Sequence, residues 1–345
     1  MHQGSGFTRR EVSQELIFGY QSSIGIFPKT NIRKGDPFGF TVGSNQDPNA
    51  QAKITAPDGI KNRFQPPHTA IHLMNTVSMN QLSTLRWSFE DDAEAYRRHG
   101  FSGIGIYRPK LEDFGVDRAI ELLAEFQLEP TSLSWVGGFT GSDGRPYTEA
   151  VADGIQAIHD AAELGVESLI VLAGGRNNHI RNHARRTLCD ALAEIAPVAE
   201  DYGVLLSLEP FHPGCGEEWS FVHDLRSTLE IVEIVGSPQL GMVLDTYHLG
   251  LDDEMLHWLP EIIPYLHLVQ LGDARHTPLG EMNRCLLGQG TVPIEQILRR
   301  LIEYNYSGPF EVELIGEDVE TFSYESILEH TRCFLEQTVG SVGQS

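Results

Sequence analysis

The sequence has few cysteines, and their spacing matches neither a metal-binding nor a disulfide-rich pattern. The 345 residues include only Cys189, Cys215, Cys285 and Cys333, which lie far apart and form no Cys-x-x-Cys pair. This spacing argues against a zinc knuckle and against a small fold held together by disulfides. We therefore expect four free thiols.

Long hydrophobic runs are also missing. The N-terminus has no apolar core of the kind found in signal peptides, and no run in the chain approaches the length of a membrane span. We therefore expect a soluble, cytoplasmic protein that does not associate with a membrane.

Basic residues are scarce relative to acidic ones. The chain contains 25 Lys and Arg against 48 Asp and Glu, which gives a formal net charge of -23. Binding to nucleic acid depends on Lys and Arg contacts to phosphate, so this balance argues against a nucleic-acid partner. A small neutral or metal-bound substrate fits the composition better.

The chain does contain eight short apolar runs that alternate with helical stretches from residue 70 onward, and its 41% hydrophobic content suffices for a sizeable core. This number of strand–helix units predicts a (β/α)8 barrel over residues 70–339. A doubly wound sheet is the alternative, but no Gly-rich phosphate loop follows the first run. The predicted strands are 71–77, 103–107, 132–136, 168–173, 204–208, 241–244, 266–269 and 310–314.

Several positions mark the ends of the predicted helices. Ser88 and Asp91 form an acidic variant of a capping box, and Ser220 is predicted to cap the helix after the fifth strand. Glycines stand where a left-handed C-terminal cap is expected, at Gly100, Gly165, Gly203 and Gly236.

Two segments lie outside the predicted barrel. Residues 1–69 are rich in Gly, Pro, Asn and Gln, lack any sustained period, and hold eight basic against five acidic residues. We read them as an irregular extension that is either a flexible arm or a basic arm lying on the acidic body or a neighbouring subunit. Residues 340–345 are predicted to be a C-terminal tail.

Acidic or amide side chains end the last four predicted strands. Glu209, Asp245, Gln270 and Glu313 come from consecutive strands, whose carboxyl ends meet at one rim of a parallel barrel. Three carboxylates in a small space repel one another unless a cation lies between them. Oxygen ligands of this kind suit Mg²⁺ or Mn²⁺. Ordinary ion pairs are the alternative, and Arg275 is the only basic residue close to these positions within the motifs.

These motifs resemble those of the xylose-isomerase-like sugar phosphate isomerases and epimerases, a family of barrels that includes ketose 3-epimerases, hydroxypyruvate isomerase and inositol-pathway isomerases and dehydratases. The resemblance covers roughly residues 70–335 and is most specific after residue 204. The motifs that carry it are SLEPFHP (207–213), VLDTYH (243–248), VQLGDARH (269–276), LGQGTVPIEQIL (287–298) and SGPFEVEL (307–314).

The resemblance implies a role for each matching residue. Glu209, Asp245, Gln270 and Glu313 would hold one divalent metal, and the two glutamates would act as acid and base on opposite faces of a sugar. The substrate-contacting histidine and arginine would be His248 and Arg275.

The seventh strand departs from many members of the family, which have histidine as the ligand there. Gln270 matches the hydroxypyruvate-isomerase type, whereas His267 would be the ligand in another register. The choice affects metal preference, because imidazole would favour Zn²⁺ or Mn²⁺, and Co²⁺ is a further option.

Other residues carry weaker signals. His212 is either a substrate contact or a structural histidine, and Trp135 is either an apolar wall for the sugar or a core aromatic. His179 and His183 are four residues apart, but no third ligand is evident in the sequence, so a solvated helix start or a substrate loop is favoured over zinc.

The leading hypothesis is a homo-oligomeric, metal-dependent isomerase or epimerase that acts on a ketose or keto-polyol through an enediolate. The same chemistry would also serve a lyase or dehydratase on an oxidised sugar or inositol. An endonuclease IV-like DNA-repair barrel is disfavoured by the charge. A non-catalytic sugar-binding barrel is disfavoured because binding alone does not need both Glu209 and Glu313.

Overall fold

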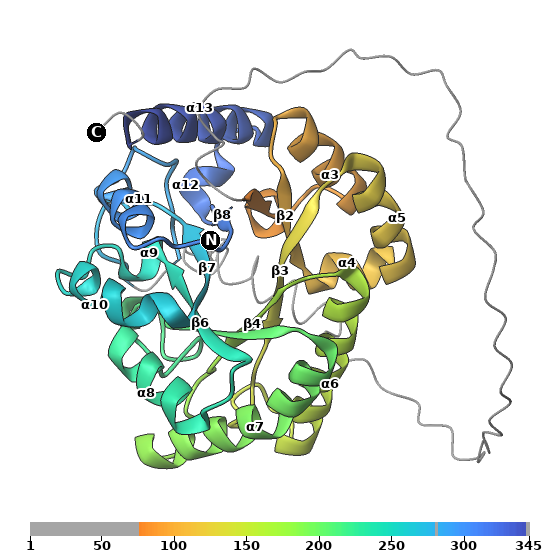
Figure 1. The fold of residues 1–345 in the computed structure, drawn as a ribbon, viewed down its shortest axis with the longest axis vertical. Helices are drawn as coiled ribbons and strands as arrows, with labels where there is room; N and C mark the ends of the chain where they lie inside the picture. The colour runs from red at the N-terminus through yellow and green to blue at the C-terminus, as the bar shows by residue number, and fades with distance from the viewer. Residues whose placement is uncertain (1–75, 280–281, 343–345) are drawn as a thin grey trace, which may run out of the picture. The chain divides into compact units, whose positions relative to one another are not determined.

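The computed structural model describes residues 76–279 and 282–342, with side chains to residue 338. Eight parallel strands close into a barrel in sequence order, because β8 pairs with β1 as well as with β7 (Figure 1). The predicted (β/α)8 barrel is therefore confirmed. The strands are β1 (Val77–Asn80), β2 (Gly103–Tyr107), β3 (Glu129–Val136), β4 (Ser168–Leu172), β5 (Leu205–Glu209), β6 (Leu240–Asp245), β7 (Leu266–Leu271) and β8 (Phe310–Val312).

Helices surround the strands, as Figure 1 shows. The α-helices are α3 (Phe89–Arg98), α4 (Arg108–Phe114), α5 (Val116–Phe126), α6 (Tyr147–Leu164), α7 (Arg181–Tyr202), α8 (Leu225–Val235), α9 (Thr246–Leu249), α10 (Met255–Ile262), α11 (Ile294–Glu303), α12 (Glu317–Glu320) and α13 (Tyr324–Val342). Short 3-10 helices occur at η3 (Gln81–Thr84), η4 (Pro213–Cys215) and η5 (Ile263–Tyr265).

Seven of the predicted strands agree with the structure to within a few residues, but the first does not. The prediction placed it at 71–77, whereas β1 is Val77–Asn80, and residues up to 75 lie outside the described part of the chain. The interior face of β1 carries Ser78 and Asn80. A search for runs of hydrophobic residues therefore does not detect this strand. The first residues of the C-terminal tail predicted at 340–345 are helical, because α13 continues to Val342, and the tail itself stays a prediction.

The extension predicted at residues 1–69 falls outside the described residues, so its role and the domain boundary at residue 70 stay predictions. The four cysteines are all free, as expected: Cys189, Cys215 and Cys285 are buried and Cys333 is exposed.

The helices form as their sequence signals predict, with one exception. Gly165, Gly203 and Gly236 end α6, α7 and α8 in the left-handed conformation, which a glycine adopts without steric cost. The cap predicted at Ser220 is wrong. Asp224 caps α8 by accepting a hydrogen bond from the backbone N–H of Ser227, while the Ser220 hydroxyl bonds the backbone of Val222.

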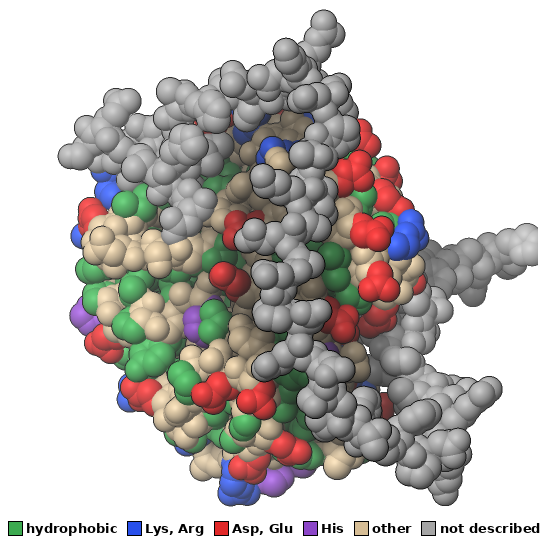
Figure 2. All heavy atoms as spheres, turned by 45° about the vertical axis from the view of Figure 1, so that its right-hand side comes forward, with side chains coloured by type: hydrophobic (Ala, Val, Ile, Leu, Met, Phe, Trp, Pro, Cys, Tyr) green, Lys and Arg blue, Asp and Glu red, His purple; other side chains and the backbone are tan. Residues whose placement is uncertain are grey.

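The surface of the barrel is rich in acidic side chains, which Figure 2 shows distributed over the described part of one face. Among the described residues, no helix combines the length and the apolar character that crossing a membrane requires.

The first helix provides a test of local stability. Ser88 and Asp91 form the predicted capping box at α3, in which each side chain bonds the backbone N–H of the other residue. Replacing Ser88 with Ala should lower the free energy of unfolding by about 1 kcal/mol, since the backbone N–H of Asp91 loses its acceptor. Urea denaturation would measure this. Ser88→Thr keeps the hydroxyl, which accepts from the backbone N–H of Asp91 and donates to its carboxylate, and should stay close to wild type. Equal losses in both variants would contradict a capping role.

Candidate active site

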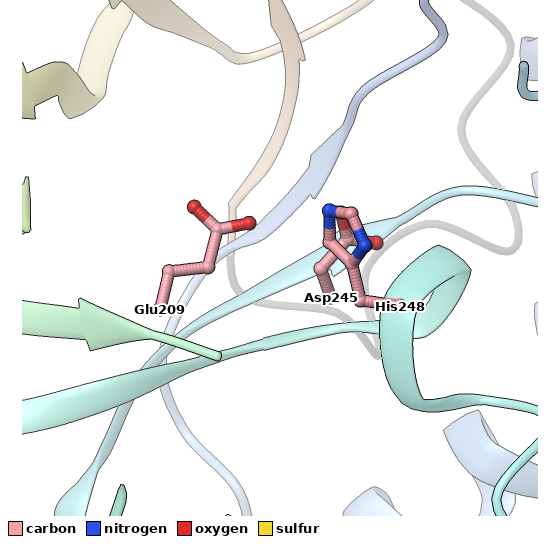
Figure 3. Close-up of side chains that lie close together, drawn as sticks. All are labelled: Glu209, Asp245 and His248. Carbon is pink, nitrogen blue, oxygen red and sulfur yellow. The ribbon is translucent and has the colours of Figure 1, made fainter. Parts of the chain in front are cut away.

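The candidate site is built from the residues that end three strands of the barrel. Glu209 and Asp245 are the last residues of β5 and β6, and Glu313 directly follows β8. All three side chains are buried, with exposed fractions of 5%, 0% and 7%. Figure 3 shows Glu209, Asp245 and His248 close together. The convergence predicted for the three carboxyl groups is thus what the structure shows.

A guanidinium group lies between two of these carboxyls. Arg284 is fully buried, and its Nη2 atom is 2.5 Å from Asp245 Oδ2 and 2.9 Å from Glu313 Oε1. Its guanidinium carbon also lies 4.4 Å from the centre of the Tyr247 ring. Burial alone lowers the pKa of Arg284, but attraction to Asp245 and Glu313 outweighs burial and raises it above its ordinary value. The guanidinium therefore stays charged.

Sequence reasoning missed Arg284 and named Arg275 instead. The structure does not bring Arg275 to the carboxyls: its side chain is 53% exposed, and its Nε atom is 3.4 Å from Asp318. Arg284 lies just before the Leu-Gly-Gln-Gly motif. The Asn-Arg pair in front of that motif is the feature of the sequence that could have identified Arg284 as a site residue.

The motifs around β7 hold Arg284 in place. The Asp273 carboxylate accepts hydrogen bonds from the backbone N–H groups of Gly288, Gly290 and Val292, at 2.9 to 3.2 Å. These bonds fold the following loop back onto the end of β7. Gly272 leaves the necessary room, because a Cβ atom there would lie 2.9 Å from Arg284 Nε. The Gly-Asp-Ala and Leu-Gly-Gln-Gly motifs thus have a structural role.

Gln270, at the end of β7, joins the same cluster. Its Nε2 atom donates to Glu313 at 2.9 Å and to Glu311 at 3.1 Å. His267, the alternative ligand, does not reach the cluster, since it lies near the start of β7 and its Nδ1 atom is 3.0 Å from the Ser207 hydroxyl. Burial lowers the pKa of His267 to about 4, so its ring is neutral.

His248 lies on α9, next to Asp245. Its ring stacks on Phe211 with centroids 4.0 Å apart, and its Nε2 atom is 3.7 Å from Asp245 Oδ2. One potential ligand atom from each of Glu209, Asp245 and His248 lies within 4.8 Å of the others, so these three groups meet the distance requirement of a metal site.

The tautomer of His248 decides what its ring can do. Nδ1 accepts a hydrogen bond from the backbone N–H of His212 at 3.3 Å, so it carries a lone pair. Burial lowers the pKa of His248 well below its ordinary value, and the charges of Arg284 and His212 lower it further. A neutral ring with a free lone pair on Nδ1 carries its proton on Nε2. His248 therefore presents an N–H donor to the site, where no described residue accepts it.

Aromatic side chains line the rim next to His248. Trp135 contacts Trp219 with ring centroids 5.9 Å apart, and Trp219 stacks on Phe211 at 6.1 Å. Trp135 is therefore part of a continuous aromatic surface with Trp219 and Phe211. His212 is partly buried, its Nδ1 atom accepts a hydrogen bond from the backbone of Gly214, and burial lowers its pKa.

His179 and His183 lie apart from this cluster. Their rings are 4.6 Å apart and line a separate pocket near the start of α7. Within the described part of the chain no third ligand joins them in a metal site.

The family with the description "xylose isomerase-like TIM barrel" matches residues 93–337. The chain belongs to this family. An inosose isomerase from Halalkalibacterium halodurans is 26% identical over 261 residues, which are 72% of this chain and 91% of that protein. A ketose 3-epimerase from Arthrobacter globiformis is 28% identical over 129 residues, which are 37% of this chain and 41% of that protein.

Solved structures share the barrel of this xylose isomerase-like chain. The crystal structure of the IOLI protein with a bound zinc atom has a TM-score of 0.68 and 22% identity, and the match covers 77% of this chain and 98% of that one. A structure of L-ribulose 3-epimerase has a TM-score of 0.66 and 17% identity, with 79% and 96% covered. At these identities the likeness concerns the fold.

The site of this xylose isomerase-like barrel fits a divalent cation. Three carboxylates and one guanidinium leave a formal charge of -2 when all are ionised (three negative charges less one positive). Gln270 Oε1 is buried without a partner among the described residues. Such an atom carries a desolvation cost that a bound cation removes.

Without a cation, the carboxyls hold protons more tightly than usual. Burial raises the pKa of Glu209 well above its ordinary value, and the charges of Glu313 and Asp245 raise it further. Burial and the charges of Asp245 and Glu311 raise the pKa of Glu313 to about 7, against the opposing effect of Arg284. Burial also raises the pKa of Asp245.

These shifts predict how the stability of the metal-free protein depends on pH. A carboxyl whose folded pKa is raised stabilises the fold below its unfolded pKa, and this contribution is lost as the pH rises through its folded value. For Glu313 the loss falls between about pH 4.5 and 7. Glu313→Gln mimics the protonated form, so from pH 5 to pH 8 its stability relative to wild type should rise by on the order of 2–3 kcal/mol.

Denaturation in excess chelator at each pH would measure this difference. Glu125→Gln, at an exposed position on α5, is the matched control and should keep a constant offset from wild type. If the difference in free energy of unfolding between Glu313→Gln and wild type is also constant between pH 5 and 8, the pKa of Glu313 is not raised in the folded protein.

Proposed function

We propose that this barrel is a divalent-metal-dependent isomerase or epimerase of a ketose or keto-polyol. The observation that carries the proposal is the pair Glu209 and Glu313, two buried carboxyls on non-adjacent strands with raised pKa values, which flank Asp245 and Gln270. Metal binding alone would not require two glutamates placed on non-adjacent strands across one site. Relatives named as an inosose isomerase and a ketose 3-epimerase support the same chemistry.

The metal would be held by Glu209, Asp245, Gln270 and Glu313. Their oxygen atoms favour Mn²⁺ or Mg²⁺ on chemical grounds, and the zinc in the IOLI structure keeps Zn²⁺ among the candidates. When bound, the cation supplies Lewis acidity, which acidifies a C–H group next to a carbonyl. We do not assign His248 to the metal, because ligation through Nε2 would move its proton to Nδ1, against the N–H of His212.

The remaining steps belong to side chains of this chain. One glutamate removes a proton from the carbon beside the carbonyl, and the other returns a proton from the opposite side. Return to the same carbon gives an epimer. Return to the neighbouring carbonyl carbon gives an aldose–ketose isomer, once the proton of the adjacent hydroxyl has moved to the former carbonyl oxygen.

Polar and aromatic groups around the two glutamates would orient the sugar. His248 offers its Nε2–H to a substrate oxygen, and Arg284 has two further nitrogen atoms, Nε and Nη1, without a partner among the described residues. Trp135 would provide an apolar wall, with His212 beside it. The role of Arg275 as a substrate contact stays a prediction. The cytoplasmic location and the homo-oligomeric state of the protein also stay predictions.

The first test separates metal ligands from the substrate donor. Wild type should bind about one divalent ion per chain, and Asp245→Ala should abolish binding because its carboxylate has no substitute. His248→Gln should keep metal affinity within a few-fold and instead raise KM, since it loses a substrate contact. Isothermal titration with Mn²⁺ and steady-state kinetics measure the two effects. A His248→Gln protein that cannot bind Mn²⁺ would make His248 a ligand.

The second test separates the two glutamates. Each single Gln variant, Glu209→Gln or Glu313→Gln, should block proton removal from one stereoisomer and leave some exchange from the other. The measurement is deuterium wash-in, followed by NMR, into each isomer separately, with wild type exchanging both. Equal loss from both isomers at full metal occupancy would contradict the two-base scheme. Loss of a leaving group in place of exchange would identify a lyase.

A further inference from the structure

A second carboxyl group on β8 lies beneath the candidate site. Glu311 is 0% exposed and precedes Glu313 by two residues, so the period-2 pattern of a strand places both on the interior side. Sequence reasoning singled out Glu313 and passed over Glu311. Among the described residues Glu311 forms no ion pair with Lys, Arg or His, so its charge is compensated in another way.

Hydrogen-bond donors from three other strands surround Glu311. Its Oε1 atom accepts from Asn80 Nδ2 at 2.7 Å and from Gln270 Nε2 at 3.1 Å. Its Oε2 atom accepts from the hydroxyls of Thr131 at 2.8 Å and Ser132 at 2.7 Å. An ionised carboxylate is purely an acceptor, so two donors on each oxygen match its needs.

The barrel leaves space for this carboxyl. Gly105 on β2 faces it, and a Cβ atom at that position would lie 2.3 Å from Glu311 Oε2. No real contact is that short, so a side chain at Gly105 would displace Glu311. The chamber is therefore shaped around one carboxylate, with donors from β1, β3 and β7 and a glycine from β2.

One of these donors is also a candidate ligand. Gln270 and Glu311 are direct neighbours in the pairing of β7 with β8. The Gln270 amide nitrogen lies between two carboxyls, Glu311 and Glu313. If the amide were rotated by half a turn, its oxygen would face both carboxyls and repel them. The nitrogen is thus fixed toward β8, and the amide oxygen, buried without a partner, is left for the site.

We propose that Glu311 is a positioning residue that orients the Gln270 carboxamide so that its oxygen, and not its nitrogen, is presented to the cation. The inference rests on the proposed function, because it requires a metal at this site. A carboxamide needs such a partner, since its oxygen binds a cation and its nitrogen does not. Glu313 also accepts a hydrogen bond from the Gln270 nitrogen. Glu313 is, however, a proposed metal ligand and base, whereas Glu311 has neither of these roles.

The test is a double-mutant cycle on Mn²⁺ affinity, measured without substrate by the EPR signal of free Mn²⁺. The proteins are wild type, Glu311→Gln, Gln270→Leu and the double variant. A glutamine at position 311 can turn either its nitrogen or its oxygen toward Gln270, so the orientation is no longer fixed. Glu311→Gln should weaken Mn²⁺ binding by about 10- to 100-fold when Gln270 is present. In the Gln270→Leu background the same change should cost less than about threefold.

Two results would overturn the inference. Unchanged affinity in Glu311→Gln would show that Gln270 needs no partner, and an equal loss in both backgrounds would mean that Glu311 acts through its charge alone. If wild type itself binds no Mn²⁺, Mg²⁺ or Zn²⁺, the proposed function fails, which is a separate outcome.

A milder variant keeps the test decisive if Glu311→Gln does not fold, as judged by circular dichroism in chelator. Glu311→Asp withdraws the carboxylate from Gln270 Nε2 by one methylene group, so their 3.1 Å hydrogen bond is lost, and it leaves all charges in place. It should weaken Mn²⁺ binding by about threefold or more with Gln270 present, and have no effect in the Gln270→Leu background. Absence of that dependence on Gln270 would again contradict the positioning role.

Discussion

Three carboxyl groups share the mouth of the barrel with one guanidinium, and much of the surrounding structure follows from this imbalance. Arg284 has no exposed surface, and within the described part of the chain Asp245, Glu313 and the Tyr247 ring are the groups that stabilise its charge. A buried cation of this kind destabilises the fold if its partners are lost. The Asp273 carboxylate accepts hydrogen bonds from three backbone N–H groups of the following loop, and these bonds keep Arg284 at the mouth of the barrel.

The sequence predicts the barrel well because most of its strands are continuous apolar runs. Strands such as β4 and β6 are buried throughout, so hydrophobic residues occupy almost every position. The first strand is the exception, since Ser78 and Asn80 face a polar interior and break the pattern. Hydropathy identifies strands that are buried among apolar groups, and it fails where the interior partner is a carboxylate.

The site could be predicted only in part for a related reason. Glu209 and Asp245 end clear strands, so the topology alone brings them together. Arg284 comes from a loop, and its position depends on the hydrogen bonds of Asp273, which no periodicity reports. Glu311 was within reach, because it shares a strand face with Glu313, but an acidic residue inside a short strand has no evident role until its donors are known.

The interior of the barrel also shows how Glu311 is connected to the three carboxyl groups at the mouth. Barrels of this kind usually fill their interior with branched apolar side chains, whereas here Asn80, Thr131 and Ser132 surround Glu311. A buried polar network of this sort is tolerated only when each member is satisfied. Gln270 makes this connection: its nitrogen completes the hydrogen bonding of Glu311, and its oxygen remains for the mouth. On the role proposed above, the hydrogen bond from Gln270 to Glu311 would also determine which atom of the carboxamide faces the site.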